Sequence, residues 1–370
     1  MQDVKKGKIR YEDAFKGRRV LITGHTGFKG SWLAIWLNEL GAEVLGYSLD
    51  PPSSPNNFEA SGLSGKINSV HGDINDLTFL KRSFSDFQPE FVFHLAAQPL
   101  VRYSYDRPVI TFHTNILGTV NMFEAVRSAK SVRVFINVTS DKVYENKEQQ
   151  QGYKEEDRVG GYDPYSSSKA CSEIVTQSYI RSFFLQRENI GIASARSGNI
   201  IGGGDWGSDR LLPDCVRALS EGADIIVRNA SSVRPWQFVL EPLYGYLLLA
   251  SKLFQSPHKY TGAWNFGPFD EPYYSVRDIV NSVIDFWGGG GWKDSFSESS
   301  GNKYETKFLK LNCGKAYSLL GWRTLLDIDN AVKKAVEWYK TFYDYGVASA
   351  GMYDYNVNQI KEYMRLADNS

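Results

Sequence analysis

GHTGFKG, residues 24–30, is the stretch of sequence that decides the fold. It lies between an apolar run at 19–23, predicted to be a buried strand, and residues 31–40, predicted to be a helix that ends at Gly41. In such a turn the first glycine permits the tight bend, the second lets the backbone approach a pyrophosphate, and the third lets helix and strand pack closely. The start of the helix would then offer N–H groups and a partial positive charge to phosphates. The spacing G-x-x-G-x-x-G is a variant of G-x-G-x-x-G, so the turn predicts a dinucleotide-binding unit.

Apolar runs recur along the chain at intervals that fit alternating strands and helices. Further strands are expected at 43–49, 91–95, 132–138 and 190–195, and long helices at 109–128 and 166–185. Strands that alternate with helices imply βαβ units, and therefore a parallel sheet covered by helices on both faces. The predicted fold class is α/β with a doubly wound parallel sheet.

The regular alternation stops near residue 200. Glycine-rich and aromatic segments such as GGGDW at 202–206 and GGGG at 288–291 indicate loops in the remainder. We therefore expect a nucleotide-binding domain over 1–200, with returning segments near 235–267. A smaller mixed α/β substrate lobe would be formed by 201–234 and 268–370.

Composition excludes several classes of function. The 42 Lys and Arg residues balance 42 Asp and Glu residues, so no net basic field would hold nucleic acid or an anionic membrane. Cys171, Cys215 and Cys313 form no C-x-x-C pair, which argues against a disulfide framework and a zinc site and suits a reducing cytoplasm. Residues 1–15 lack the apolar core of a signal peptide, and no apolar run approaches the roughly 20 residues that span a bilayer. A cytoplasmic protein with no metal, nucleic-acid or membrane partner is expected.

Asp50 follows the second predicted strand and points to the choice of cofactor. A carboxylate at this place binds ribose hydroxyls and repels a 2′-phosphate, so NAD is favoured over NADP. The alternative is a turn or helix-capping role before Pro51. Lys29 would touch a phosphate or be solvated, and Asp73 would bond the adenine or serve as a turn residue.

Two polar clusters carry the candidate chemistry. Tyr165 and Lys169 form a Y-x-x-x-K motif, and their i, i+4 spacing puts both side chains on one helix face. An ammonium near a phenol lowers the phenol's pKa from about 10, so Tyr165 would act as a base near neutrality. TSDK at 139–142 comes directly after the strand at 132–138, and ligands of open α/β sheets bind beyond the carboxyl ends of the strands. The alternative for this cluster is a helix cap followed by surface charges.

Together these motifs resemble the extended short-chain dehydrogenase/reductase superfamily, whose nucleotide-binding domain has a Rossmann-type sheet. Within it the chain is most similar to the nucleotide-sugar 4,6-dehydratases, and among these to the branch that acts on CDP-glucose. The wider resemblance rests on the glycine turn, the Y-x-x-x-K pair, HLAA at 94–97, TNILGT at 114–119 and RSGN at 196–199. The closer match rests on GHTGFKGSWL at 24–33, AAQPLVR at 96–102, GGGDW at 202–206 and RPWQFVLEP at 234–242.

The resemblance implies a set of site residues. Catalysis would fall to Ser140, Asp141, Lys142, Tyr165 and Lys169, although other 4,6-dehydratases carry Asp-Glu where this chain has Asp-Lys, which leaves the second acid/base group open. Cofactor binding would fall to Gly24, Thr26, Gly27, Phe28, Lys29, Gly30, Asp50, Asp73, Ile74, Leu95, Ala96, Ala97, Thr114, Tyr165 and Lys169. Substrate binding would fall to Gln98, Arg102, Asn199, Asp209, Arg210, Arg234 and Tyr304. Arg234 would neutralise a phosphate or stack on Trp236, and Tyr304 would contact the sugar nucleotide or lie in an exposed loop.

The reaction that the resemblance implies is an internal redox cycle on a nucleotide-linked glucose. Tyr165 would take the proton of the C4 hydroxyl while C4 gives a hydride to NAD. Asp141 would protonate the hydroxyl that leaves C6, after which the hydride returns to C6. Lys142, Tyr165 or a water would remove the C5 proton.

Two other functions are compatible with parts of the pattern. A 4-epimerase needs Tyr165 and Lys169 but no acid to expel water, so the Asp141-Lys142 pair favours the dehydratase. A non-catalytic NAD-binding scaffold would not need the intact set of Ser140, Tyr165 and Lys169.

The two long helices at 109–128 and 166–185 also predict an assembly state. Both carry apolar residues at helical spacing, and in the superfamily the corresponding pair packs against its copy. We therefore expect a homodimer with an isologous interface. The alternative is that both helices pack only on the sheet.

Overall fold

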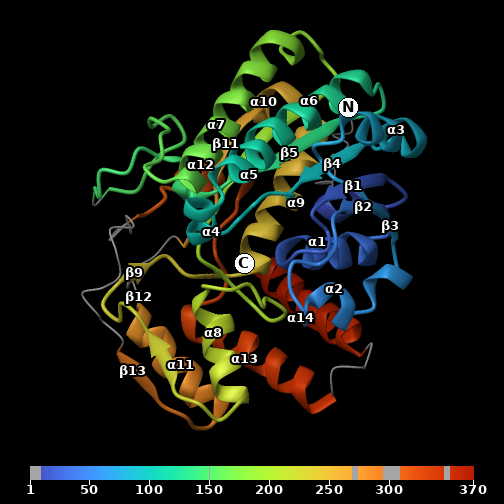
Figure 1. The fold of residues 1–370 in the computed structure, drawn as a ribbon. Coiled ribbons are helices and arrows are strands. Elements are labelled where there is room, and N and C mark those ends of the chain that lie inside the picture. Colours follow the sequence, from blue (N-terminus) through green and yellow to red (C-terminus); the bar gives the residue numbers. More distant parts are fainter. Residues whose placement is uncertain (1–9, 150, 269–273, 295–308, 346–350) are drawn as a thin grey trace, which may run out of the picture.

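Seven parallel strands form the central sheet, in the order β11-β6-β5-β4-β1-β2-β3 (Figure 1). The computed structural model describes residues 10–149, 151–268, 274–294, 309–345 and 351–370. The order reverses between β1 and β4, which is where open α/β sheets bind their ligands. The strands are β1 (Arg19–Thr23), β2 (Glu43–Ser48), β3 (Asn68–His71), β4 (Phe91–His94), β5 (Val134–Val138), β6 (Gly191–Arg196) and β11 (Gly262–Asn265).

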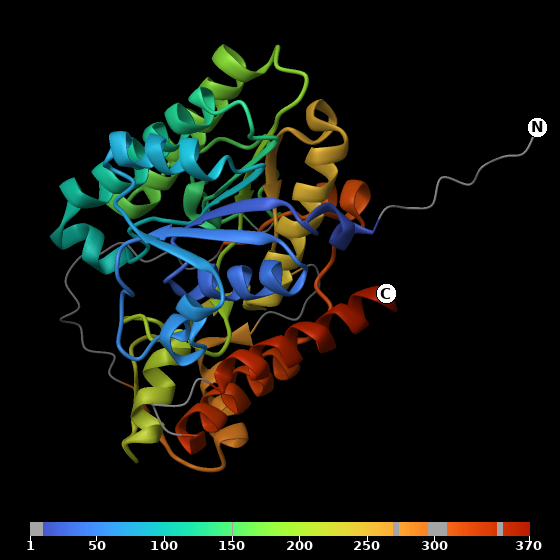
Figure 2. The same ribbon diagram turned by 90° about the vertical axis from the view of Figure 1, so that its right-hand side faces the viewer.

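Helices cover both faces of this sheet (Figures 1 and 2). In β1 the side chain of Leu21 packs into one apolar cluster, with Phe84 and Phe123, whereas Val20 and Ile22 pack into the other. The alternation follows from the strand's two-residue period. The first face carries α3 (Leu77–Phe87), α5 (Pro108–Phe112), η3 (His113–Leu117), α6 (Gly118–Ser128), α7 (Pro164–Tyr179) and η5 (Ile180–Phe184); the second carries α1 (Phe28–Glu39) and α9 (Leu240–Gln255).

The C-terminal helices lie beside α8 (Leu211–Ser220), below the sheet in Figure 1. Among them, α14 (Met352–Asp368) runs along α1 (Figure 2). Tyr353 Oη accepts a 2.7 Å hydrogen bond from Asn38 Nδ2 and donates a 2.9 Å bond to Glu39. These bonds tie the end of the chain to the helix that carries the glycine turn. The other elements here are β8 (Ile225–Val227), α11 (Val276–Trp287), β13 (Trp292–Asp294) and α13 (Ile328–Tyr345). Helix α12 (Gly314–Leu320) lies instead against β11 and α9, beside the central sheet (Figure 1).

Short elements complete the described chain. No helix in the described ranges is long and apolar enough to cross a membrane. The short elements are η1 (Tyr11–Ala14), α2 (Asn57–Ala60), η2 (Leu63–Gly65), α4 (Val101–Asp106), η4 (Asp141–Val143), β7 (Ile200–Ile201), β9 (Val233–Arg234), β10 (Gln237–Phe238), α10 (Pro257–Tyr260) and β12 (Tyr274–Ser275).

The predicted fold class is confirmed, and the five predicted strands are present within two residues of their expected ends. Two strands of the central sheet were not predicted. β3 is a four-residue edge strand that is mostly exposed, so it lacks the apolar run of its neighbours, and β11 is equally short. Helix α1 begins at Phe28, three residues earlier than predicted, because Gly27 is already its N-cap.

The glycine turn brings the backbone of α1 very close to the backbone at the end of β1. Gly24 has a φ of 77°, a left-handed conformation that side chains disfavour. A Cβ atom on Gly30 would lie 2.0 Å from the carbonyl oxygen of Gly24, so the first turn of α1 touches the end of β1 directly. Glycine is required at both positions for the helix to start where it does.

The first prediction tests this packing. Gly30→Ala should lower the free energy of unfolding by about 3 kcal/mol, the upper range for overpacking, although alanine is the better helix former. Urea denaturation followed by circular dichroism measures the change. Gly65→Ala is the matched control, because nothing lies within 4 Å of its added Cβ, and it should be neutral or slightly stabilising. Equal stability of the Gly30 variant and the wild type would contradict the role of this contact.

Candidate active site

One cavity of about 1550 Å³ lies beyond the carboxyl ends of β1, β2, β4 and β5. It brings together most of the residues singled out in the sequence. The lining includes Gly24, Thr26, Gly27, Phe28, Lys29, Gly30, Asp50, Asp73, Ile74, Leu95, Ala96, Ala97, Thr114, Ser140, Asp141, Lys142, Tyr165, Arg102, Asn199, Asp209, Arg210 and Arg234. Gln98 and Lys169 lie behind the lining, and Tyr304 lies outside the described residues.

The glycine turn shapes one half of the cavity to fit a dinucleotide. The N-cap of α1, Gly27, has no capping side chain, so the first N–H groups of the helix remain for an anion. A Cβ on Gly24 would lie 2.8 Å from the backbone nitrogen of Ala96, so the turn also packs against the end of β4. Thr26 Oγ1 bonds Ser48 Oγ at 2.8 Å and donates to the carbonyl oxygen of Leu49 at 3.0 Å, which fixes the end of β2 beside the turn. These features suit a pyrophosphate and its adjoining ribose.

The two carboxylates expected near the adenosine differ in their surroundings. Asp50 is exposed at the end of β2, with Oδ1 3.5 Å from His71 Nε2. Asp73 Oδ1 instead accepts hydrogen bonds of 2.9 Å and 3.0 Å from the backbone and side chain of Asn75. Asp73 therefore closes its own turn, while the carboxylate of Asp50 faces solvent at the cavity edge.

Asp141 is a buried carboxylate at the end of β5, held by three donors. Ser140 Oγ donates to Oδ1 at 3.0 Å, Asn199 Nδ2 donates to Oδ2 at 3.0 Å, and Lys142 Nζ lies 3.5 Å from Oδ1. A Cβ on Gly198 would lie 2.1 Å from the carboxyl carbon, so only glycine leaves room for this group. Asn199 has a φ of 51°, a left-handed conformation that asparagine tolerates. The amide expected to bind substrate thus positions Asp141.

Tyr165 and Lys169 lie on α7, which starts with a capping box formed by Asp163 and Ser166. Both side chains are buried, and Lys169 Nζ donates to the carbonyl oxygen of Val138 at 3.3 Å. Burial raises the pKa of Tyr165 to about 12, against the opposing effect of a hydrogen bond with Ser140. The sequence predicted a lowered pKa for Tyr165, and this prediction is wrong when only the groups of the protein act on the phenol. Desolvation of the phenolate outweighs the nearby positive charge. Burial likewise lowers the pKa of Lys169 to about 8, with Glu173 acting in the opposite direction.

Glu173, one helical turn beyond Lys169, was not identified in the sequence. Its carboxylate accepts hydrogen bonds from Thr139 at 2.5 Å, Ser194 at 2.7 Å and Arg196 at 2.8 Å, and all four side chains are buried. Burial opposes its charge, but Arg196 and the two hydroxyls hold the pKa of Glu173 below its usual value. The usable signal in the sequence was the i, i+4 spacing from Lys169, because it places a carboxylate on the buried face of α7.

Lys29 is an amine in an electrostatically unfavourable place. It lies in the first turn of α1, where the helix dipole disfavours a cation. Within the described part of the chain its Nζ has no hydrogen-bond or ion-pair partner. Burial lowers the pKa of Lys29 to about 7, with repulsion from Lys169 and Arg210 adding to the effect and Asp141 opposing it. Groups with costly, strongly shifted charges inside a cavity mark functional sites.

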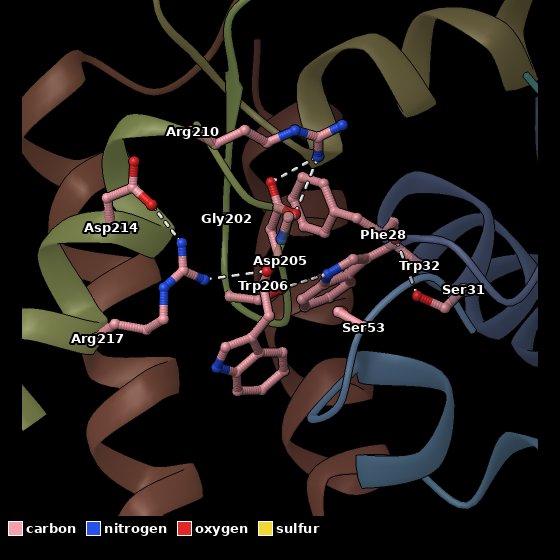
Figure 3. Close-up of polar contacts among 12 residues, drawn as sticks. Phe28, Ser31, Trp32, Ser53, Gly202, Asp205, Trp206, Arg210, Asp214 and Arg217 are labelled. Atoms are coloured by element: carbon pink, nitrogen blue, oxygen red, sulfur yellow. Dashed lines mark hydrogen bonds and ion pairs between the residues drawn. The ribbon is translucent and has the colours of Figure 1, made fainter. Parts of the chain in front are cut away.

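The GGGDW loop forms the opposite wall of the cavity, and its Asp205 holds the side chain of Arg210 in place (Figure 3). Arg210 NH1 donates to both carboxylate oxygens of Asp205, at 2.9 Å and 2.8 Å. Trp32 of α1 donates from Nε1 to the carbonyl oxygen of Gly203 at 2.9 Å, so the loop is fastened to the helix of the glycine turn. Asp205 raises the pKa of Arg210, which stays a cation beside Tyr165.

The remaining predicted substrate residues are dispersed. Gln98 is buried and committed to Thr111 at 2.7 Å and to the backbone N–H of Leu100 at 2.6 Å, so it supports the cavity wall from behind. Arg234 lies on β9 and faces the cavity, with NH1 donating to the carbonyl oxygen of Val233 at 2.9 Å. In the part of the chain that the structure describes, no group of three metal-binding side chains gathers.

The sheet order, the glycine turn and the Tyr165–Lys169 pair at one cavity define the short-chain dehydrogenase/reductase class of dinucleotide-binding proteins. Comparison with known proteins narrows this class. Residues 21–265 match the model of the family described as GDP-mannose 4,6 dehydratase, and the chain belongs to this family.

Individual relatives agree with the family assignment. The chain is 44% identical over 333 residues to a CDP-glucose 4,6-dehydratase of Salmonella typhimurium, covering 89% of this chain and 92% of the relative. It is 27% identical to UDP-glucuronate 4-epimerase 1 of Arabidopsis thaliana, covering 89% and 78%. A solved dTDP-glucose 4,6-dehydratase from Streptomyces venezuelae, with NAD bound, shares the fold with a TM-score of 0.74 at 21% identity, covering 88% of this chain and 98% of that one.

The second prediction concerns the titration of Lys29. With a pKa of about 7, Lys29 is largely neutral at pH 8 and should be acylated readily there, and its labelling should fall as the pH drops through 7. The control is exposed Lys293, whose pKa is raised by its bond to Asp224, so it stays protonated at pH 8. Peptide mass spectrometry after brief acetylation at several pH values measures both. A Lys29 profile that matches that of Lys293 would refute the shifted pKa.

Proposed function

We propose that the protein is a CDP-glucose 4,6-dehydratase that uses NAD as a cofactor regenerated in each cycle. The observation that carries the proposal is the position of Asp141. Its carboxyl group is buried and lines the same cavity as Ser140 and Tyr165. Loss of water needs such an acid, whereas epimerisation does not. The cytidine nucleotide is supported by 44% identity to a CDP-glucose 4,6-dehydratase over most of both chains.

The first step is oxidation at C4 of the hexose. Tyr165 removes the proton of the C4 hydroxyl, and the Ser140 hydroxyl, which bonds the phenol, holds the same sugar oxygen. NAD, when bound, would supply the hydride acceptor and donor that this cycle needs, together with a positive charge that favours the phenolate. Lys169 adds a buried positive charge one helical turn from the phenol.

The second step is loss of water between C5 and C6. The new C4 ketone makes the C5 hydrogen acidic, and Asp141 in its protonated form protonates the hydroxyl that leaves C6. When the hydride is added at C6, the proton taken from C5 by the base is returned to C5, which gives the 4-keto-6-deoxy sugar. Lys142 is our candidate for the base at C5, because its Nζ lies 3.5 Å from Asp141 Oδ1, and C5 and C6 are adjacent carbons. Asn199 keeps the acid in place during both steps.

Cofactor and substrate occupy different parts of the cavity in this proposal. The glycine turn and Asp50 hold the cofactor, and the Asp50 carboxylate disfavours the 2′-phosphate of NADP. The substrate nucleotide lies toward Arg102, Asp209, Arg210 and Arg234. We propose that 1–200, with the returning segments near 235–267, bind the cofactor, and that 201–234 and 268–370 form the substrate lobe.

The third prediction tests the reaction itself. Purified protein offered CDP-, dTDP-, UDP- and GDP-glucose separately should convert CDP-glucose, and mass spectrometry should show the loss of one water from the product. Cofactor released by denaturing the protein should be NAD. A product of unchanged mass would identify an epimerase instead, and no turnover of any nucleotide sugar would refute the proposal.

The fourth prediction separates Tyr165 from Asp141. Tyr165→Phe should lose every step, so the absorbance of reduced nicotinamide never rises after substrate is added. Asp141→Asn should lose about 10²–10⁴-fold in overall turnover, the usual contribution of a positioned acid, and should accumulate reduced cofactor because C4 oxidation survives. If Asp141→Asn binds substrate but never reduces the cofactor, Asp141 acts in oxidation rather than in elimination.

Exposed apolar side chains support a homodimer. They gather on the neighbouring helices of one sheet face, where Val109 is 79% exposed. Solvent-facing apolar clusters on a helix pair mark protein–protein contacts. The residues are Val109, Ile110 and Phe112 on α5, Leu117 on η3, Ile174 on α7 and Phe183 on η5.

The fifth prediction tests this interface. Light scattering should give twice the chain mass at micromolar concentration, and Val109→Glu with Ile174→Glu should give the single chain mass. Leu366→Glu, an exposed apolar position on α14, is the control and should leave the dimer intact. A single chain mass for the wild type would end the dimer proposal.

A reducing compartment suits the cysteines. All three are free, and Cys215 and Cys313 are buried. Burial raises the pKa of both buried thiols to about 12, so they stay protonated and unreactive. We propose a cytoplasmic location on these grounds.

A further inference from the structure

Three charged side chains from separate elements meet at the edge of the cavity. Asp209, in the loop before α8, accepts a 2.8 Å hydrogen bond on Oδ1 from Arg228 NH1, and the same oxygen lies 3.7 Å from Arg102 NH1. Arg228 follows β8, and Arg102 lies on α4. All three line the cavity that contains Tyr165 and Asp141, so the cluster belongs to the ligand site rather than to the outer surface.

The geometry is that of two guanidinium groups on a single oxygen. Each arginine has five N–H donors, and within the described residues neither has another acceptor besides Asp209. One carboxylate leaves the cluster with a net positive charge. A phosphate group offers three oxygens in an arrangement that a guanidinium binds in bidentate fashion, so a phosphate satisfies this cluster better than Asp209 does.

Asp209 is held weakly. Its φ of 58° is left-handed, a conformation that aspartate tolerates as asparagine does. The side chains of Asp209, Arg228 and Arg102 are 43%, 45% and 46% exposed, and ion pairs of that exposure contribute little stability. A charge pair that adds little to stability is readily exchanged for a stronger anion.

We propose that Arg228 and Arg102 form the subsite for the diphosphate of the substrate, and that the carboxylate of Asp209 occupies this subsite until the diphosphate displaces it. The inference rests on the proposed function and adds Arg228, which had no role assigned. The phosphates of the cofactor already have their place at the N-terminus of α1, so a second diphosphate needs a second set of cations.

The test is calorimetric titration of the NAD-loaded protein with CDP. Arg228→Met should weaken CDP binding about 10- to 100-fold, the range expected for losing charge-assisted hydrogen bonds. Asp209→Asn should strengthen CDP binding about 5- to 10-fold, since it removes the competing charge while asparagine still tolerates the left-handed backbone. Arg228→Lys should be intermediate, because lysine keeps the charge but not the fork.

Two controls isolate the subsite. Arg82→Met and Asp86→Asn make the same charge changes in an exposed ion pair on α3, and neither should alter CDP binding. Cytidine, which has no phosphate, should bind equally to the wild type and to Asp209→Asn. Thermal melting and NAD content establish that each variant is folded.

The outcomes separate the two levels of the proposal. If the wild type binds CDP but folded Arg228→Met binds it equally well, the subsite is refuted and the proposed function stands. Weaker binding by Asp209→Asn would also refute it, because Asp209 would then be a ligand rather than a competitor. If the wild type binds neither CDP nor CDP-glucose, the proposed function itself is wrong.

Discussion

The buried carboxylate of Glu173 is the interaction on which the arrangement of the active site depends. It joins three elements of the fold at one point: Thr139 at the end of β5, Ser194 and Arg196 on β6, and its own helix α7. Because Tyr165 and Lys169 lie on α7 and Asp141 follows β5, this contact sets their relative positions. Removing one member of such a buried pair costs about 3–5 kcal/mol, because the other is left charged and unpartnered. Tyr165, Lys169 and Asp141 are therefore positioned by a network in which Thr139 lines the cavity and Glu173, Ser194 and Arg196 lie outside its lining.

Some charged side chains in the cavity are neutralised by a partner, and others are not. Arg210 is neutralised by Asp205, and Asp141 receives three donors. Lys29 has no such compensation among the described residues, and the Arg102–Arg228 pair has only one shared oxygen. Uncompensated cations therefore lie at two places, the start of α1 and the cavity edge. An enzyme that holds two diphosphates at once, one from its cofactor and one from its substrate, needs two such places.

The close approach of other groups to the backbone is the second constraint, and it explains why glycine is needed at positions where charge has no effect. Gly30 lets α1 meet β1, and Gly198 gives room to the carboxylate of Asp141. Trp32 then fastens the GGGDW loop to α1. As a result, the glycine turn and the GGGDW loop, which form opposite sides of the cavity, are attached to one helix. Displacing α1 would disturb both sides together.

Local sequence patterns determined the class of fold and the location of the chemistry. The glycine spacing and the alternating apolar runs are enough to predict a parallel sheet with a dinucleotide site, because they depend only on neighbours in the chain. The edge strands β3 and β11 escaped prediction because each has only four residues, and β3 is in addition mostly exposed. Tertiary structure alone decided how the site residues are used. Asn199 bonds Asp141, and burial raises the pKa of Tyr165 where an adjacent lysine had suggested the reverse. Each of these results depends on desolvation or on contact between residues far apart in the sequence, and no local pattern encodes either one.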